Sequence, residues 1–343
     1  MRILVTANQT PFIQGGADYH MQGFVHALRQ SDHEVELLRL PFKFQPYADL
    51  HRSMQFAEAW DASRPNGVSI DRVISLQFPL YGVQHPDHWI WVMHQHRAVY
   101  DLYPHEASAE LQDLRLAVKA FDERHLGQAK ALFANSQNVA QRLARYNQLE
   151  AKVLYHPPPL MERYHCAQAG PYVFYPSRVE SLKRQFLLLQ AASLMQSDLK
   201  IVIAGEGGQL SALQSELIRL RLQDRVLLTG RISEAQKIAW YAHAQAVCFL
   251  PIDEDYGYIT FETFLSSKPV LTCSDSGGPL EFIRHEENGW VEEADPLAIA
   301  QRLDWLSAHP EAVRKMGLIA RETYDDHQIT WQGVVDALTA QQP

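Results

Sequence analysis

Short apolar segments alternate with segments of helical period along most of this 343-residue sequence. Between the strand-like segments 2–7 and 34–40, apolar residues from Met21 to Leu28 recur at the spacing of one helix face. Parallel strands need long crossover connections, so this alternation predicts an α/β fold with a doubly wound parallel sheet. The strands expected in the first half of the chain are 2–7, 34–40, 72–76, 89–93, 131–134 and 153–155.

A run of three prolines from Pro157 to Pro159 interrupts the alternation, which then starts again. We expect two Rossmann-like domains, residues 1–165 and 166–328, that face each other across a cleft. A helix at 329–343 follows, and the pattern leaves open whether it lies on the second domain or returns to the first. Ligands bind beyond the carboxyl ends of the strands in such sheets. The strands expected in the second half are 172–177, 200–204, 225–229, 246–250 and 269–273.

Composition excludes several classes of protein. The net charge of −9 argues against a nucleic-acid partner. No apolar run approaches the roughly 20 residues of a membrane-spanning helix. The three cysteines are widely spaced without a zinc-binding pattern, which fits a reducing compartment. We therefore expect a cytoplasmic protein, and we leave peripheral membrane association open.

Two glutamates separated by seven residues form the most informative pattern. Glu254 falls in the loop after a predicted strand, and Glu262 falls in the first turns of the helix that follows Gly257. The first amides of that helix, at Tyr258 and Ile259, lie at its positive dipole end and suit a diphosphate. Carboxylates accept paired hydroxyl hydrogen bonds, which suits a sugar. Two solvated acids are the alternative.

Two cations lie near the end of the predicted strand 172–177. Arg178 follows it directly, and Lys183 lies at the start of the next helix. A guanidinium and an ammonium group can neutralise a departing phosphate without a metal ion. A pair of surface cations is the alternative. Asp253 and Asp255 form a weak metal-binding pattern, and we expect neither a metal nor another cofactor.

Glycines come after one predicted strand in each half of the chain, after 2–7 in the first half and after 200–204 in the second. Gly15, Gly16 and Gly205 allow the backbone to approach a ligand closely, although each also suits a tight turn. Leu210 occupies the place of the third glycine of the dinucleotide-binding fingerprint. That departure argues against a nicotinamide-dependent oxidoreductase.

Polar and aromatic side chains cluster after the predicted strand 89–93. His94 follows the strand directly and could orient a reacting hydroxyl. His96 is the other candidate for that role. The alternative for single members is a core histidine and an ion pair between Arg97 and Asp101.

The segment 41–60 is expected to be a loop. Its aromatic side chains could touch a ligand or a membrane surface, and we expect them to pack down instead. They are Phe42, Phe44, Tyr47, Phe56 and Trp60.

In this order, the motifs resemble those of the retaining GT-B glycosyltransferases of family 4, most densely between residues 172 and 291. The resemblance implies a UDP-sugar or GDP-sugar donor and metal-independent transfer with retention. The acceptor, whether sugar, lipid or small molecule, stays unspecified. It also implies that Glu254 contacts the donor sugar, that Glu262 binds the ribose hydroxyls, and that Arg231 lies near the base. The predicted catalytic residues are His94, Arg178, Lys183 and Glu254; the predicted donor-binding residues are Gly15, Gly16, Gly205, Arg231, Gly257, Tyr258, Ile259 and Glu262.

Two alternatives share this architecture. A nonhydrolysing nucleotide-sugar epimerase would need a base that removes a ring proton, and no clear candidate stands out. A catalytically silent module would bind the nucleotide sugar without turnover. The intact set of charged residues favours the transferase.

Overall fold

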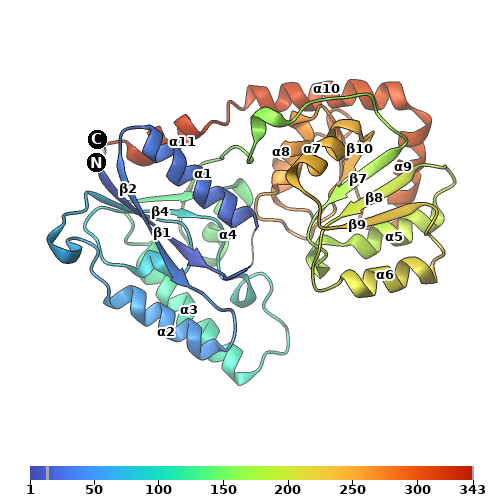
Figure 1. Cartoon of the computed structure of the whole chain (residues 1–343). Coiled ribbons are helices and arrows are strands. Elements are labelled where there is room, and N and C mark those ends of the chain that lie inside the picture. The colour runs from blue at the N-terminus through green and yellow to red at the C-terminus, as the bar shows by residue number, and fades with distance from the viewer. Residues whose placement is uncertain (13–14, 342–343) are drawn as a thin grey trace. The chain divides into compact units, whose positions relative to one another are not determined.

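The computed structural model describes residues 1–12 and 15–341, and the chain divides into two compact units (Figure 1). Unit 1 comprises Met1–Pro159 and Thr330–Pro343, and unit 2 comprises Leu160–Ile329. The boundary between Pro159 and Leu160 comes directly after the three prolines. Of the helices in the described ranges, none combines the length and the apolar character needed to cross a bilayer.

Unit 1 contains a six-stranded sheet with the order β2-β1-β3-β4-β5-β6, in which all neighbouring strands are parallel. β1 lies next to both β2 and β3, so the chain winds from β1 first to one side and then to the other. This is the doubly wound α/β topology that the sequence predicts. The strands are β1 (Arg2–Gln9), β2 (Glu34–Pro41), β3 (Arg72–Ser75), β4 (His88–Val92), β5 (Ala131–Ala134) and β6 (Lys152–Val153).

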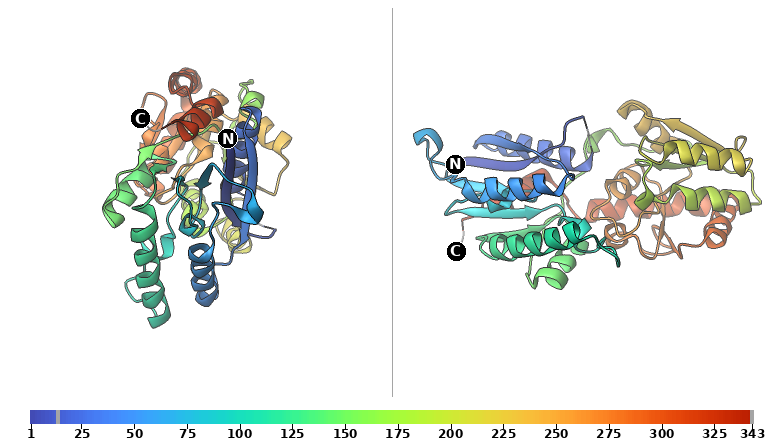
Figure 2. Two further views of the ribbon diagram at one scale, coloured as in Figure 1. Left: turned by 90° about the vertical axis from the view of Figure 1, so that its left-hand side faces the viewer. Right: turned by 90° about the horizontal axis from the view of Figure 1, so that it is seen from below.

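The sheet of unit 1 has a separate hydrophobic core on each face, because successive side chains of a strand point to opposite faces. Ile3 and Val5 belong to the core that α1 and α11 complete. Leu4 belongs to the other core, to which α2, α3 and α4 contribute. Figure 2 shows α2 and α3 running side by side. The helices are α1 (Gly16–Gln30), α2 (Tyr47–Ala59), α3 (Ala109–Leu126), α4 (Gln137–Asn147) and α11 (Trp331–Thr339).

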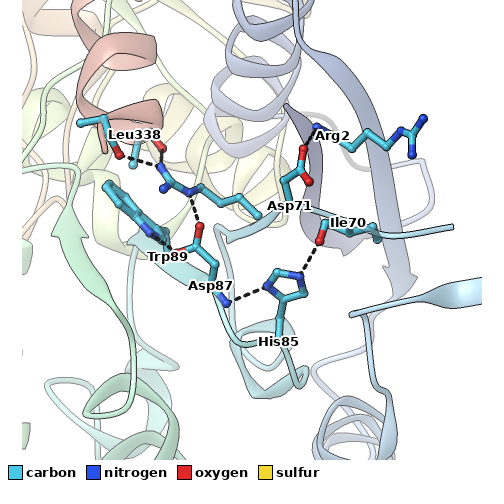
Figure 3. A network of polar contacts seen from close by, with 9 residues as sticks. Arg2, Ile70, Asp71, His85, Asp87, Trp89 and Leu338 are labelled. Carbon is cyan, nitrogen blue, oxygen red and sulfur yellow. Dashed lines mark hydrogen bonds and ion pairs between the residues drawn. The ribbon is translucent and has the colours of Figure 1, made fainter. Parts of the chain in front are cut away.

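The last helix, α11, packs against α1 within unit 1. A Cβ atom on Gly23 of α1 would lie 2.3 Å from Cζ2 of Trp331, so only glycine permits this approach. At the other end of α11, the buried Arg72 donates from Nη1 to the Leu338 carbonyl (2.9 Å) and from Nε to Asp87 (2.9 Å; Figure 3). Arg72 thereby satisfies a carbonyl that the helix terminus leaves open.

Unit 2 contains a second parallel six-stranded sheet with the order β12-β11-β10-β7-β8-β9. β7 and β10 are neighbours at its centre, where the direction of winding reverses. The strands are β7 (Tyr172–Pro176), β8 (Lys200–Ala204), β9 (Val226–Gly230), β10 (Ala246–Cys248), β11 (Val270–Cys273) and β12 (Gly289–Glu292). The helices are α5 (Gln185–Leu194), α6 (Leu210–Arg219), α7 (Glu234–His243), α8 (Tyr258–Leu265), α9 (Pro296–Ala308) and α10 (Pro310–Asp326).

The segment 41–60 differs from the expected loop, because it contains the helix α2. Leu50, Met54 and Ala57 recur at helical spacing and bury one face of α2. An amphipathic helix leaves its other face in solvent. Phe42 packs into the core as expected, but the packing prediction is wrong for Phe44 and Phe56, which are 57% and 44% exposed.

The edge strand β12 is another element that the sequence analysis missed. It has four residues and begins with a glycine. A Cβ atom on Gly289 would lie 2.5 Å from the Val270 carbonyl oxygen of β11. Gly289 allows β12 to pair closely with β11. Glycine is also typical of turns, and this obscures the strand in the sequence.

Candidate functional site

The loops at the carboxyl ends of β7 to β11 form one continuous edge of the unit 2 sheet. Backbone hydrogen bonds join the loops of neighbouring strands in this edge. They run from Glu254 N to Ser276 O (2.9 Å), Ile252 N to Leu182 O (2.8 Å), Val179 N to Glu206 O (3.0 Å) and Gly205 N to Gly230 O (2.9 Å). The backbone thus fixes the places of the loops that carry most of the predicted site residues.

Lys183 and Glu254 form an ion pair on this edge, and each side chain is 22% exposed. Nζ of Lys183 also lies 5.6 Å from the ring centroid of Phe249. The fully buried Tyr175 ties the two loops together, because its hydroxyl donates to the Lys183 carbonyl and accepts from the Leu250 amide (3.1 Å). The structure therefore brings together two predicted residues that are far apart in sequence.

Arg178 lies on the same loop as Lys183 but is more exposed. Its guanidinium pairs with Glu180 at 2.9 Å, and its side chain is 57% exposed. Arg184, which the sequence analysis missed, pairs with Asp275 at 2.7 Å and is only 15% exposed. The hydrogen bonds from Arg184 lower the pKa of Asp275. The loop after β7 thus carries three paired cations, of which Arg178 is mostly exposed and Lys183 and Arg184 are largely buried.

Glu262 lies on α8 and is only 4% exposed. One carboxylate oxygen is 3.0 Å from Nζ of Lys237, and the other accepts a 2.6 Å hydrogen bond from the Tyr241 hydroxyl. Burial lowers the pKa of Lys237, but the charges of Glu262 and Glu234 outweigh it and raise that pKa above its ordinary value. Glu254 and Glu262 are both partnered, so the alternative of two solvated acids is wrong.

The helix α8 begins at Tyr258, as predicted, and Gly257 precedes it with a left-handed φ of 85°. A Cβ atom on Gly257 would lie 3.0 Å from Cε1 of Phe249, a second reason for glycine here. Gly257 has no side chain that could cap this terminus itself. Burial raises the pKa of Tyr258, and the charge of Glu262 raises it further. The first amides of α8, at Tyr258 and Ile259, lie at the positive end of the helix dipole.

Gly205 and Arg231 follow β8 and β9 on the same edge. Gly205 has a φ of 146°, and a Cβ atom there would lie 2.0 Å from the Ser177 carbonyl oxygen. Close packing of the β7 and β8 loops therefore requires glycine at this position. Arg231 is exposed at the end of β9. The structure places both residues on the edge that the sequence predicts.

In unit 1, the structure distinguishes the two histidines that follow β4. His94 is half-buried, and its Nδ1 lies 2.9 Å from the Gln95 carbonyl oxygen. His96 is 7% exposed, and burial, with a smaller effect of His94, lowers its pKa to about 4. Arg97 pairs with Asp101 at 2.6 Å, which confirms the simpler explanation for that residue. His94 is thus the histidine that remains reachable.

Gly15 and Gly16 begin α1 at the carboxyl end of β1. Gly15 is extended, and an added Cβ atom would meet nothing within 4 Å. Its amide donates to Asp18 (3.2 Å), which also pairs with Arg39 (2.8 Å). The chain itself therefore supplies an acceptor for the Gly15 amide.

A buried polar network, also missed in the sequence, supports the loop after β4. The Gln95 side chain donates to Asn147, which donates to the Tyr100 hydroxyl (3.1 Å). The hydroxyls of Tyr100 (2.7 Å) and Tyr81 both donate to Asp122, which is fully buried. Burial raises the pKa of Asp122 to about 7.

Among residues 1–12 and 15–341, no cluster of three or more His, Cys, Asp or Glu side chains could hold a metal ion. Lys237 and Tyr241 are missed residues that contact the predicted Glu262. Their four-residue spacing places them on one face of α7. Nothing in the sequence indicated that this face meets Glu262, because that contact depends on how two helices pack.

Comparison with known proteins gives a family match in unit 2. The model of the family described as "Glycosyl transferases group 1" matches residues 162–323. The human alpha-1,3/1,6-mannosyltransferase ALG2 is 32% identical over 89 residues, which are 26% of this chain and 21% of ALG2. The N-acetyl-alpha-D-glucosaminyl L-malate synthase of Bacillus anthracis is 24% identical over 167 residues, 48% of this chain and 43% of that protein. The chain thus spans less than half the length of these curated relatives.

The crystal structure of HepE from Anabaena in complex with UDP and glucose has the same fold. It superposes with a TM-score of 0.72 at 16% identity, over 99% of this chain and 100% of HepE. The α/β fold with two Rossmann-like units is therefore GT-B, as the sequence predicts.

Proposed function

We propose, on the premise that this chain belongs through its second unit to the glycosyl transferases group 1 family, that it transfers a sugar from a nucleotide diphosphate donor to an acceptor. The observation that carries the proposal is the Lys183–Glu254 pair on the edge that also carries the N-terminus of α8. This edge combines a cation, a carboxylate and the positive end of a helix dipole. These three features suit a diphosphate linked to a sugar.

The chemistry of transfer explains why the cations matter. The bond between the anomeric carbon and the diphosphate oxygen breaks, and its electron pair leaves with the diphosphate. The acceptor hydroxyl oxygen then bonds to the anomeric carbon, and its proton passes to the departing phosphate oxygen. Stabilising the charge on the leaving diphosphate supplies most of the catalysis in such a step. We assign that role to Lys183, Arg178 and the amides of Tyr258 and Ile259.

The remaining site residues receive positioning roles in the proposal. Glu254 binds the donor sugar and Glu262 binds the ribose. Gly205 and Arg231 flank the nucleoside, while His94 in unit 1 orients the acceptor hydroxyl. We further propose that the new bond forms with retention and without a metal ion. HepE was crystallised with UDP and glucose, which supports a UDP-type donor, and a GDP-type donor remains the other candidate.

Thermal unfolding with UDP, GDP, UMP and GMP tests the proposal. We expect one diphosphate to stabilise the protein by about 2.7 kcal/mol at 100 times its Kd, and the matching monophosphate by much less. Lys183→Ala should abolish this gain. Lys200→Ala is the matched control, because Lys200 is an exposed lysine of the same unit whose ammonium donates to the Asp224 carbonyl. This variant should keep the gain in stability. An equal gain in Lys183→Ala would contradict the proposal.

The anomeric configuration of the product tests the proposed stereochemistry. Proton NMR of the product formed from the stabilising donor should show the same anomeric configuration as the donor. Epimerised donor in the absence of any acceptor would favour the epimerase instead. Inverted product would contradict the retaining mechanism while leaving the transferase in place.

A further inference from the structure

Helix α7 holds the Glu262 carboxylate from two sides. Lys237 and Tyr241 are four residues apart on α7, so their side chains share one face of the helix. The Lys237 ammonium lies 3.0 Å from one carboxylate oxygen, and the Tyr241 hydroxyl lies 2.6 Å from the other. The side chains of Lys237 and Glu262 are 16% and 5% exposed, and Tyr241 is fully buried. The carboxylate therefore has one orientation.

Stability alone does not account for this arrangement. A buried ion pair contributes little to stability, because desolvation offsets the attraction between its charges. Lys237 also has a second partner, Glu234, at 2.9 Å, whose side chain is 39% exposed. Lys237 would therefore stay paired near the surface without Glu262, whereas Glu262 has no second cation within ion-pair distance among the described residues. The pair matters more to the glutamate than to the lysine.

A carboxylate offers roughly four positions at which it can accept a hydrogen bond. Lys237 and Tyr241 occupy one on each oxygen of Glu262. One position on each oxygen is left, and two neighbouring hydroxyls of a ribose can donate to both.

We propose that Lys237 and Tyr241 are positioning residues that keep Glu262 oriented for both ribose hydroxyls, and so make the site selective for ribonucleotides over 2′-deoxyribonucleotides. This inference rests on the proposed function, since it assumes that Glu262 binds the ribose. A 2′-deoxy ligand leaves one buried acceptor position without a donor, which is a large penalty in a site built for that hydrogen bond. Loss of the Lys237 ammonium leaves the buried Glu262 carboxylate without that cation, and its orientation is then less fixed. A carboxylate that turns no longer accepts equally well from both hydroxyls.

The experiment compares the Kd values of UDP and GDP with those of their 2′-deoxy counterparts by isothermal titration calorimetry. We expect the wild-type protein to bind the ribonucleotide of its preferred base at least about tenfold more tightly than the deoxyribonucleotide. Lys237→Met should reduce this ratio to below about threefold. The affinity for the deoxyribonucleotide should change little. Lys237→Arg should restore most of the ratio, since a guanidinium also supplies a cation.

Arg302→Met is the matched control. Arg302 also lies in unit 2, its side chain is 18% exposed, and it pairs with two glutamates, Glu292 (2.6 Å) and Glu286 (3.6 Å). The ratio should be unchanged in this variant. Tyr241→Phe removes one hydroxyl with little change of shape, and it should lower the ratio to an intermediate value even if Lys237→Met fails to fold.

The outcomes separate the two proposals. If Glu262→Gln loses the discrimination but Lys237→Met and Tyr241→Phe keep it, the positioning role is wrong and the proposed function stands. If Glu262→Gln itself keeps the wild-type ratio, Glu262 does not bind the ribose, and both the inference and that part of the proposed function fail. An equal loss of affinity for both sugars in Lys237→Met indicates a purely structural role and also overturns the inference.

Discussion

The two units share one architecture but differ in the state that their buried titratable groups must hold at neutral pH. In the described chain, the buried histidines His20, His88, His96 and His156 all lie in unit 1. Burial lowers the pKa of each of them, to about 4 for His88 and His96 and to about 3 for His156. Unit 1 therefore needs these side chains uncharged.

Along its carboxyl edge, unit 2 instead holds charged pairs. Lys183 pairs with Glu254, and Lys237 pairs with Glu262. These charges are in place before any ligand arrives, and preorganised charges stabilise a charged transition state without a cost of reorganisation. The difference indicates that the two sheets, though alike in topology, serve different parts of the proposed reaction. In the proposed reaction, unit 2 binds the charged donor.

The largest expected effect tests the charged edge of unit 2. Lys183→Ala should reduce turnover of the nucleotide-sugar donor by about 1000-fold or more, because it removes the preorganised cation that pairs with Glu254. Arg178→Ala should have a smaller effect, since Arg178 is 57% exposed and its field is screened by solvent. The rate at which nucleotide diphosphate is released measures the turnover of both variants. Equal losses of turnover would show that the burial of a cation does not determine its contribution to catalysis.

The next effect tests the neutral histidines of unit 1. Below pH 6.5 a histidine in the unfolded chain takes up a proton, whereas His88 and His96 in the folded chain stay neutral down to about pH 4. Their contribution to stability is thus present above pH 6.5 and is lost as the pH falls towards 4. At pH 5 the loss is about 2 kcal/mol for each of the two. Hydrogen exchange should show unit 1 losing protection first.

Asp122 serves as the internal control for that prediction, because it titrates in the opposite sense. Its pKa is raised to about 7, so its contribution to stability grows as the pH falls through 7. Asp122→Asn should therefore make the loss of unit 1 stability in acid larger by about 2.6 kcal/mol between pH 8 and pH 5. A unit 2 that opens before unit 1 in acid would contradict the comparison.

The sequence predicted the strands better than the surroundings of the polar side chains. β5 and β8 have the predicted bounds, because a short apolar run is a local signal. The spacing of Glu254 and Glu262 was also read correctly as loop and helix. Their partners were not predictable, since the contacts to Lys183 and Lys237 span 71 and 25 residues and depend on how elements pack.

The same limit applies to unit 1. The order His94-Gln95-His96 does not show which histidine turns into the core. The structure separates them because His96 packs beside Phe78, with ring centroids 5.4 Å apart, while His94 stays partly exposed. Helix α2 was missed for a related reason, since its buried face rests on only three residues.

A smaller effect tests the membership of α11 in unit 1. Gly23→Ala places a methyl group 2.3 Å from Trp331 and should destabilise unit 1 by about 1–3 kcal/mol, as α11 shifts away from α1. Hydrogen exchange of the α11 backbone amides should become faster. In a Trp331→Ala background the same change should cost much less, because the clash is gone. If the cost is the same in both backgrounds, the Gly23–Trp331 contact does not hold the helix.

The smallest expected effect concerns metal ions. If fixed cations and amides carry the diphosphate charge, EDTA should leave turnover within about twofold of its original value, because protein charges already provide the stabilisation. Asp253→Asn and Asp255→Asn should likewise change turnover only slightly, whereas the neighbouring Glu254→Gln should reduce it strongly. The three variants form a matched series, since each removes one charge from consecutive residues of one loop. A loss of activity in EDTA that Mn²⁺ restores, together with a large effect of Asp253→Asn or Asp255→Asn, would assign the diphosphate charge to a metal ion and remove the basis for separating a charged unit 2 from unit 1.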